Sequence, residues 1–482
     1  MPITKAPLPQ QLNQLDRDRF SRYRTLLKFY QGDQWLNTPY SQTTVSAPWL
    51  ELENEPRYPW LRRLTLNYAK VLIDKITAYT MAGFKIAVDP ADQTKASADL
   101  AKRAEDALAR INEANVLTAI DFDTEIDTAI LGDGCYKVTW DPTTKDVRVT
   151  TPDVQGIFAW WLGDDTARLW RVASKYVLSA EEIEMLHGYE TQKATVVVIE
   201  DWTDRSYDLW IDGKIASSSR NPYGFIPYVI YPNIREPKQF WGASDIPQIM
   251  QPTRELNRAM SQLSRILELS GNPITVLEGV DRATDITVQP GQIWELPEKS
   301  KAYLLDLLQG GGVKLHIDYI DALYRTIHDL SESPRTAFGD NQKALSGVAL
   351  EMELHPLLQK VRRKRLIRSD AYNRRSDMIL KLLRQFKEGS GPGTIPHDAN
   401  LSQIRSRIIW GDVLPQDHSR TVDDETRLVE KGIHSRKRAA DNLGIDNPEA
   451  EFDRWIVEQR QVEAITAPPA TPAPEPSKVQ PK

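Results

Sequence analysis

The chain has 482 residues, of which 40% are hydrophobic and 27% are charged, and this composition excludes a disordered chain, a collagen and a bundle of membrane helices. Its 61 lysines and arginines are outnumbered by 67 aspartates and glutamates, and the net charge of −6 argues against tight binding to duplex DNA. A single cysteine, Cys135, excludes a disulfide framework and a cysteine-built zinc site, and the length of the chain favours about two to four domains.

The first predicted elements are helices. Residues 10–30 are compatible with one helix, and residues 66–79 form a clearer one, because apolar side chains recur at steps of three and four until Gly83. Two further helices are expected at 94–115 and 117–131. The N-terminus lacks the apolar stretch of a signal peptide, and no segment approaches the roughly 20 apolar residues of a spanning helix. We therefore expect no membrane association.

Residues 135–232 are predicted to be mainly β structure. Apolar and polar side chains alternate between turn residues, as is typical of strands that bury one face. Asp212-Gly213 fits a tight hairpin turn, and a short helix is expected near 179–187. The expected strands are 136–140, 147–150, 195–202, 207–211 and 214–215.

Two long helices with a small insert between them come next. Residues 244–270 carry one apolar stripe after a capping serine, and residues 313–332 carry another, which ends before Pro334. The insert is expected to contain strands at 274–277 and 292–296.

A third long helix completes the pattern. A loop at 334–347 leads into a helix over 348–388, in which Pro356 is expected to cause a kink because proline lacks the N–H and crowds the preceding turn. The remaining expectations are a strand at 404–410, two or three short helices within 415–464, and a disordered tail in the last 18 residues, which hold six prolines.

No catalytic motif stands out, and we expect neither an enzyme nor a bound cofactor or metal. The chain lacks the G-x-x-x-x-G-K-[ST] loop of nucleotide motors. Asp121, Asp123, Glu125 and Asp127 alternate along a predicted helix, where successive members point apart, and we interpret them as a solvated face. A metal-dependent nuclease that uses these residues, with Asp123 as its test position, remains the enzymatic alternative.

The helix over 348–388 carries a basic cluster. Arg362, Arg363, Lys364 and Arg365 are candidates for a DNA-facing surface, which would attract phosphates without reading the sequence. The favoured alternative is that the cluster pairs with acidic neighbours, including those of other subunits. The whole cluster is Lys360, Arg362, Arg363, Lys364, Arg365, Arg368, Arg374 and Arg375, opposed only by Asp370.

Several short sequences occur in an informative order. They are Tyr30-Gln31-Gly32-Asp33, Asn67-Tyr68-Ala69-Lys70 with Ile73-Asp74, Gly83-Phe84, Asn221-Pro222-Tyr223-Gly224-Phe225-Ile226-Pro227, Gly242-Ala243-Ser244-Asp245-Ile246 and Ser346-Gly347-Val348-Ala349-Leu350. Together with two long helices around a β insert, a loop and a kinked helix, they resemble the portal proteins of tailed bacteriophages, specifically the Gp6-like siphophage portal family. The resemblance covers residues 20–460, nearly the whole chain.

The resemblance implies an α+β, mainly helical fold that is divided into named parts. The wing would comprise 1–243 and be completed by 389–414. The other parts would be stem helices at 244–270 and 313–333, a clip at 271–312, a tunnel loop at 334–347, a long kinked helix at 348–388, a short crown at 415–464 and a tail at 465–482.

The resemblance also implies a function. Members form a closed ring, typically of twelve subunits, at one capsid vertex, and double-stranded DNA passes non-specifically through the axis during packaging and ejection. ATP hydrolysis belongs to a separate terminase, which docks near the clip. Further implied partners are head-completion or adaptor proteins and the capsid and scaffolding proteins. The implied location is the virion, after assembly in the host cytoplasm; another virion component, such as an adaptor, remains an alternative.

Three residues are candidate contacts on this basis. Arg335 and Lys343 in the tunnel loop are expected to lie near the DNA, with two solvated loop charges as the alternative. Trp294 in the clip is a candidate partner contact, with structural packing as the alternative.

Overall fold

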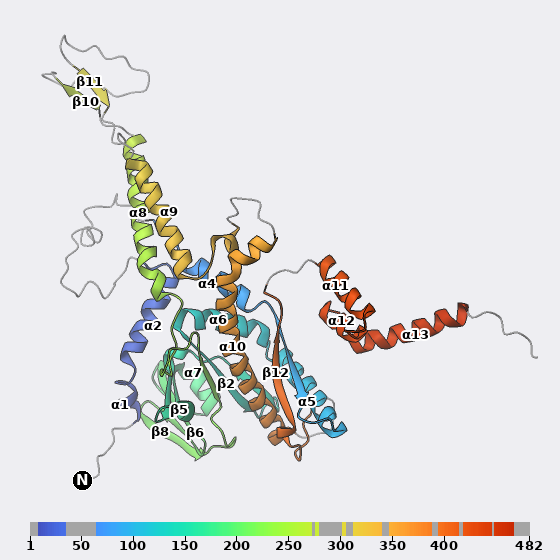
Figure 1. Cartoon of the computed structure of the whole chain (residues 1–482). Coiled ribbons are helices and arrows are strands. Elements are labelled where there is room, and N and C mark those ends of the chain that lie inside the picture. Colours follow the sequence, from blue (N-terminus) through green and yellow to red (C-terminus); the bar gives the residue numbers. More distant parts are fainter. Residues whose placement is uncertain are drawn as a thin grey trace, which may run out of the picture. The chain divides into compact units, whose positions relative to one another are not determined.

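The computed structural model describes residues 8–34, 64–271, 275–278, 301–304, 312–339, 347–387, 394–413, 418–445 and 448–466. It combines helices and antiparallel sheets, which confirms the predicted α+β class (Figure 1). The chain forms two compact units, Met1–Gly411 and Asp412–Lys482. None of the helices in the described ranges is both long enough and apolar enough to cross a membrane.

The N-terminal part of the first unit is helical. The single helix predicted over 10–30 is wrong: it is two helices, and Asp16, in the left-handed conformation with φ 57°, lies between them. Asn67 and Thr94 cap the next two helices by accepting backbone hydrogen bonds, and Gly132 ends the last in the left-handed conformation. The helices are α1 (Leu8–Leu12), α2 (Arg17–Tyr30), α4 (Tyr68–Thr80), α5 (Lys95–Ala114) and α6 (Leu117–Leu131).

Two antiparallel sheets form the β-rich part of this unit. One has the strand order β4-β5-β6-β7-β8 and the other the order β3-β2-β9. Asp212 and Gly213, with φ of 48° and 82°, make the predicted hairpin turn between β7 and β8. The strands are β2 (Asp133–Asp141), β3 (Asp146–Thr150), β4 (Ile157–Leu162), β5 (Asp165–Ser179), β6 (Thr195–Thr203), β7 (Ser206–Ile211), β8 (Lys214–Arg220) and β9 (Tyr228–Pro232).

Strands β4, β5 and β9 were not predicted individually. Residues 157–162 are continuously apolar, β5 has an irregular burial pattern, and the first four residues of β9 are all buried. None of the three therefore has the period of two that identified the other strands. At the end of β5, helix α7 (Ala180–His187) forms where one was expected, and Ser179 and Glu182 close a capping box at its start.

A pair of strands from distant parts of the chain completes the first unit. Strand β1 (Phe84–Pro90) pairs with β12 (Ile404–Trp410) in antiparallel register from Phe84–Trp410 to Pro90–Ile404. The sequence predicted β12 but not β1. Helices α5 and α10 contact this pair, and the buried side chains of all four elements belong to one hydrophobic core.

Three long helices follow in the order that the sequence predicted. Helices α8 (Pro247–Gly271) and α9 (Gly312–Leu330) lie side by side, and the first turns of α10 (Gly347–Phe386), which contains Pro356, run at an angle to the rest of that helix (Figure 1). Strand β10 (Thr275–Glu278) pairs with β11 (Lys301–Leu304), a strand that was not predicted. The strand predicted at 292–296 lies outside the described residues.

The second unit contains helices α11 (His418–Glu430), α12 (Arg436–Asn442) and α13 (Pro448–Thr466), which confirms the helices expected within 415–464. Glu425 of α11 joins this helix to α12, since its carboxylate accepts a hydrogen bond from Asn442 and lies 2.8 Å from Nδ1 of His434. The proline-rich tail from residue 467 lies outside the described residues. Short 3-10 helices occur at Val154–Gly156, Arg335–Phe338 and Leu401–Gln403.

Candidate functional site

A ladder of buried ion pairs runs along one face of helix α10, which follows the predicted tunnel loop. Lys360, Lys364, Arg368 and Arg375 recur at steps of four and seven, which places them on one side of the helix. All four are buried in the monomer. Long basic side chains are rarely buried without partners, so the ladder requires matching acids.

The upper part of the ladder is centred on Asp245, just before α8. Nζ of Lys360 lies 2.8 Å from Oδ1 of Asp245, and Nζ of Lys364 lies 2.6 Å from Oδ2. The segment that leads into α8 is therefore tied to α10 at two successive turns.

The lower part of the ladder joins α10 to helix α6. Arg368 donates two hydrogen bonds to Glu125, with N···O distances of 2.7 and 2.8 Å, and a third of 2.6 Å to the carbonyl of Asn233. Arg375 pairs with both carboxylate oxygens of Asp121. Two-pronged pairs of this kind fix orientation as well as distance.

These contacts correct the interpretation of the acidic series on α6. Asp121 and Glu125 are fully buried, whereas Asp123 and Asp127 are exposed. The prediction of a solvated face is therefore wrong for Asp121 and Glu125, because the arginines of α10 cover that side of the helix. Since each of these two carboxylates is already held by an arginine, the structure gives no support to the nuclease alternative. Among the residues that the structure describes, no group of three or more His, Cys, Asp or Glu side chains could hold a metal ion.

The candidate basic surface on α10 also needs correction. Lys364 is in the ladder, and Arg365 is buried, with hydrogen bonds from its guanidinium to the carbonyls of Thr80 and Gly411 at 3.0 and 2.7 Å. A DNA-facing surface is therefore contradicted for these two residues, because the body of the first unit covers them. The favoured alternative, pairing with acidic neighbours, holds for Lys364, whose partner Asp245 lies in the same chain. Arg362 and Arg363 are exposed, and Arg363 pairs with Glu332 at 2.6 Å.

The pKa shifts in the ladder follow from competition between burial and pairing. Burial alone would raise the pKa of Asp245, but the ammonium groups of Lys360 and Lys364 hold it well below its usual range. Burial alone would lower the pKa of Arg368, but the carboxylate of Glu125 raises it. For Lys364, burial dominates and lowers the pKa. Asp245 is accordingly ionised at neutral pH, and removing one partner would leave a charge buried.

The turn between α9 and the loop is clamped onto the same helix. Nδ1 of His328 lies 2.7 Å from the carbonyl oxygen of Ser333, and Nζ of Lys360 donates to the carbonyl of Ser331 at 3.0 Å. The His328 ring also packs edge-on against Tyr324 and Phe338. The first residues of the loop therefore start from a rigid frame.

Of the three candidate contact residues, the structure describes only Arg335. Arg335 lies in the 3-10 helix at Arg335–Phe338, with Nη1 3.3 Å from Oδ1 of Asp321 and its guanidinium 5.0 Å from the centre of the Tyr324 ring. Its side chain is directed toward α9. Lys343 and Trp294 lie outside the described residues.

The α8–α9 pair has an apolar seam and also carries exposed apolar side chains. Leu256, Ile320 and Ile327 pack together in a core that extends to Tyr23 and Leu72. Large apolar side chains that remain exposed on the two helices are Leu267, Leu315, Ile317 and Tyr319. They do not form one stripe, because Leu315 and Ile317 are two residues apart on α9 and Tyr319 donates a hydrogen bond to Glu255 of α8. Leu315, 72% exposed, is the most exposed of the four.

Sequence reasoning found both halves of the ladder but did not match them. Asp121 and Glu125 are four residues apart, and so are Lys360, Lys364 and Arg368, so each set forms a stripe on its own helix. Two complementary stripes on predicted helices were the signal that could have indicated a pairing. Asp245 lies on neither of these two helices, so no periodic pattern in the sequence indicated its pairing.

The buried ion pairs fix α10 to α6 and to the segment before α8, and Lys360 fixes the turn after α9. The charged groups pair with one another, which is typical of a structural role. A family model described as phage portal protein, SPP1 Gp6-like, matches residues 10–464. No curated protein matches the chain.

Proposed function

The chain belongs to the SPP1 Gp6-like family of phage portal proteins, and from this premise we propose that its copies assemble into a closed ring of twelve subunits at one capsid vertex. Double-stranded DNA would pass through the axis during packaging and ejection. The observation that carries the proposal is the match over residues 10–464, together with the order α8, β10–β11, α9, loop and α10. As a portal protein, the chain is a component of the virion.

The exposed apolar side chains on α8 and α9 support ring formation. Leu315 is 72% exposed in the single chain, and Leu267 and Ile317 are 53% and 52% exposed. In a ring, each subunit presents one surface to the neighbour ahead and a different surface to the neighbour behind, and such contacts close when the rotation per subunit divides the circle. Leu315 is suited to contact with such a neighbour, because burying it would remove apolar area from water.

We assign the parts of the portal to the chain as follows. The wing would be 1–243 with 389–414, and the pairing of β1 with β12 across these two ranges supports their union. The other parts would be stem helices at 244–270 and 313–333, a clip at 271–312, a tunnel loop at 334–347, a long kinked helix at 348–388 and a crown at 415–464.

The ladder on α10 would transmit force between the wing and the tunnel loop. Because buried pairs join α10 to α6 and to the start of α8, a push on the loop is carried to the body of the wing. Lys343 is the better candidate for approaching DNA, since Arg335 is engaged by Asp321 and Tyr324. The acidic chain as a whole would keep phosphate attraction weak, so that the duplex can slide.

The protein would act without catalysis or a cofactor of its own. ATP hydrolysis would come from a terminase that docks near the clip, where Trp294 is a candidate contact. Head-completion or adaptor proteins, the capsid and scaffolding proteins would be the other partners, with assembly in the host cytoplasm.

Negative-stain electron microscopy of the purified full-length chain tests the proposal. We expect ring-shaped particles with a central hole wide enough for a duplex. Ring formation would be contradicted if the particles had the size of a single chain at all accessible concentrations and light scattering gave the mass of a single chain.

A further inference from the structure

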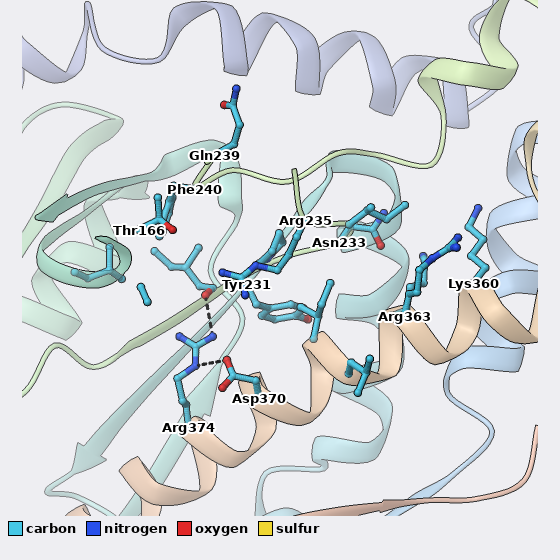
Figure 2. Close-up of a pocket in the computed structure, with 18 residues that line it drawn as sticks. Thr166, Tyr231, Asn233, Arg235, Gln239, Phe240, Lys360, Arg363, Asp370 and Arg374 are labelled. Carbon is cyan, nitrogen blue, oxygen red and sulfur yellow. Dashed lines mark hydrogen bonds and ion pairs between the residues drawn. The ribbon is translucent and has the colours of Figure 1, made fainter. Parts of the chain in front are cut away.

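A pocket of about 610 Å³ opens on the surface of the first unit (Figure 2). It lies between helix α10, the segment after β9, and the start of β5. Apolar side chains line its wall, and the side chain of Leu366 at its rim is 73% exposed. The apolar lining includes Leu169, Phe240, Leu366 and Ile367. An exposed leucine beside an apolar hollow is a surface suited to being covered.

The rim of the pocket carries basic side chains, of which one is unpaired among the described residues. Five basic residues line the pocket against Asp370, but Lys360 and Lys364 are buried and paired with Asp245. Arg374 pairs with Asp370 at 3.0 Å and points along the pocket wall, and Arg363 pairs with Glu332 (Figure 2). Arg235 is exposed and has no ion-pair partner within the described part of the chain. The occupant should therefore combine apolar side chains with a carboxylate that faces Arg235.

Helix α7 has this combination. Met185, 79% exposed, has the highest exposed fraction of the large hydrophobic side chains that the structure describes, and its neighbour Leu186 is also exposed. The helix also carries three glutamates, Glu181, Glu182 and Glu184. Buried Ile183 anchors it on the sheet beside β5 and β6, and the capping box at Ser179 fixes its start. It is a short, rigid, acidic element with uncovered apolar side chains.

The pocket and α7 lie at opposite ends of one strand. Leu169 in the pocket wall belongs to the first third of β5, and α7 begins directly after its last residue, Ser179. At the rise of a β-strand, the ten residues between them span roughly 35 Å. The two surfaces of one chain therefore cannot meet, but those of neighbouring copies can.

We propose that helix α7 of one subunit inserts Met185 and Leu186 into the pocket of the next subunit, with one of its glutamates facing Arg235. Because the two surfaces differ, the contact is head-to-tail and repeats around a ring. The inference rests on the ring proposed above and identifies one contact within it.

Cysteine crosslinking tests the contact. The one native cysteine, Cys135, is buried, so introduced cysteines react selectively. A Met185→Cys, Leu366→Cys double variant is purified as assembled rings and treated with a short bis-maleimide, which does not require ideal disulfide geometry. The matched control is Met185→Cys with Met352→Cys, since Met352 is 75% exposed on the same helix.

We expect a ladder of crosslinked chains on a denaturing gel for the first pair, forming about tenfold faster than for the control pair because contact raises the effective concentration. Mixing rings of the two single variants after disassembly and reassembly should give crosslinked dimers, whereas neither single variant alone should. Rings that form normally but crosslink no faster than the control would overturn this contact and leave the ring intact. A parent chain that forms no rings would overturn both proposals.

Discussion

At the scale of single residues, the buried charges of the first unit decide its stability. Arg368 is fully buried, and its guanidinium is directed at Glu125, Asn233 and the carbonyl of Pro232. A buried charge is tolerated only with such partners, because taking an unpaired ion out of water costs several kcal/mol. Removing one partner of a pair in the ladder should therefore destabilise the fold, unlike the loss of an exposed surface ion pair.

Glu125→Ala should destabilise the protein by about 3–5 kcal/mol, because it leaves Arg368 buried without its carboxylate. Asp123→Ala is the matched control, since Asp123 is exposed on the same helix and its loss should change the free energy of unfolding by no more than about 0.5 kcal/mol. Chemical denaturation of both variants measures the difference. Equal stabilities would show that the ladder contributes little.

Asp133 should give the protein an unusual pH dependence. Burial raises the pKa of Asp133 to about 6, although its carboxylate accepts hydrogen bonds from Tyr23 at 2.5 Å and from the Gly242 N–H at 2.7 Å. Because the folded state then binds the proton more tightly than the unfolded state, this residue's contribution to stability falls as pH rises from about 4 to about 6. The difference from its ordinary pKa of 3.8 corresponds to about 3 kcal/mol.

Asp133→Asn removes this titration. We expect the variant to gain stability relative to the parent by up to about 3 kcal/mol between pH 4 and pH 7, measured by denaturation at a series of pH values. Asp245 acts in the opposite sense, since its depressed pKa makes its contribution fall only below about pH 4. A difference between variant and parent that is constant from pH 4 to pH 7 would be inconsistent with a raised pKa at Asp133.

At the scale of elements, each long helix has a covered and an uncovered side. Helix α9 packs through Ile320, Leu323 and Ile327 against α8 and its neighbours, while Leu315 is 72% exposed. The covered side holds the chain together, and in the proposed ring the uncovered side would contact another subunit.

Leu315→Ser should therefore impair assembly without unfolding the chain. Leu315 is 72% exposed in the single chain, so its loss should hardly change the free energy of unfolding of the monomer. If a neighbour buries it, each interface loses about 1.5–3 kcal/mol. Light scattering after size-exclusion chromatography measures the ring fraction, with Lys314→Ser, an exposed neighbour, as control. Equal ring fractions for the two variants would argue against burial of Leu315.

At the scale of the whole molecule, the first unit needs a strand from near its C-terminal end. Strand β12 pairs with β1 over seven residues, and the carbonyl of Gly411 accepts from Arg365. The second unit, from Asp412, has its own helices. The boundary between the two units is therefore sharp and can be tested by truncation.

A chain that ends at residue 413 should fold, whereas a chain that ends at residue 400 should not. The shorter chain loses β12 and leaves the backbone groups of β1 without partners and the hydrophobic core around Ile408 open. Circular dichroism and limited proteolysis compare the two. Comparable protease resistance would mean that β12 is dispensable.

Much of this protein follows from local sequence. The helix predicted at 117–131 and the strand predicted at 404–410 have the observed bounds, because their apolar periods and their end residues are local signals. The order of the long helices and the short motifs along the chain also indicates the portal family, and the family match over residues 10–464 confirms it.

The tertiary structure alone decided what covers each face. The period of Asp121 and Glu125 shows that they share one side of a helix, but not that Arg375 and Arg368 lie opposite them. In the same way, nothing in the sequence near β1 indicates that its partner strand lies more than three hundred residues away. The sequence around Lys364 and Arg365 is typical of an exposed helix face, but the rest of the first unit buries both side chains. A periodic pattern depends on neighbours within one or two turns, whereas burial and pairing depend on segments that the chain brings together only when it folds.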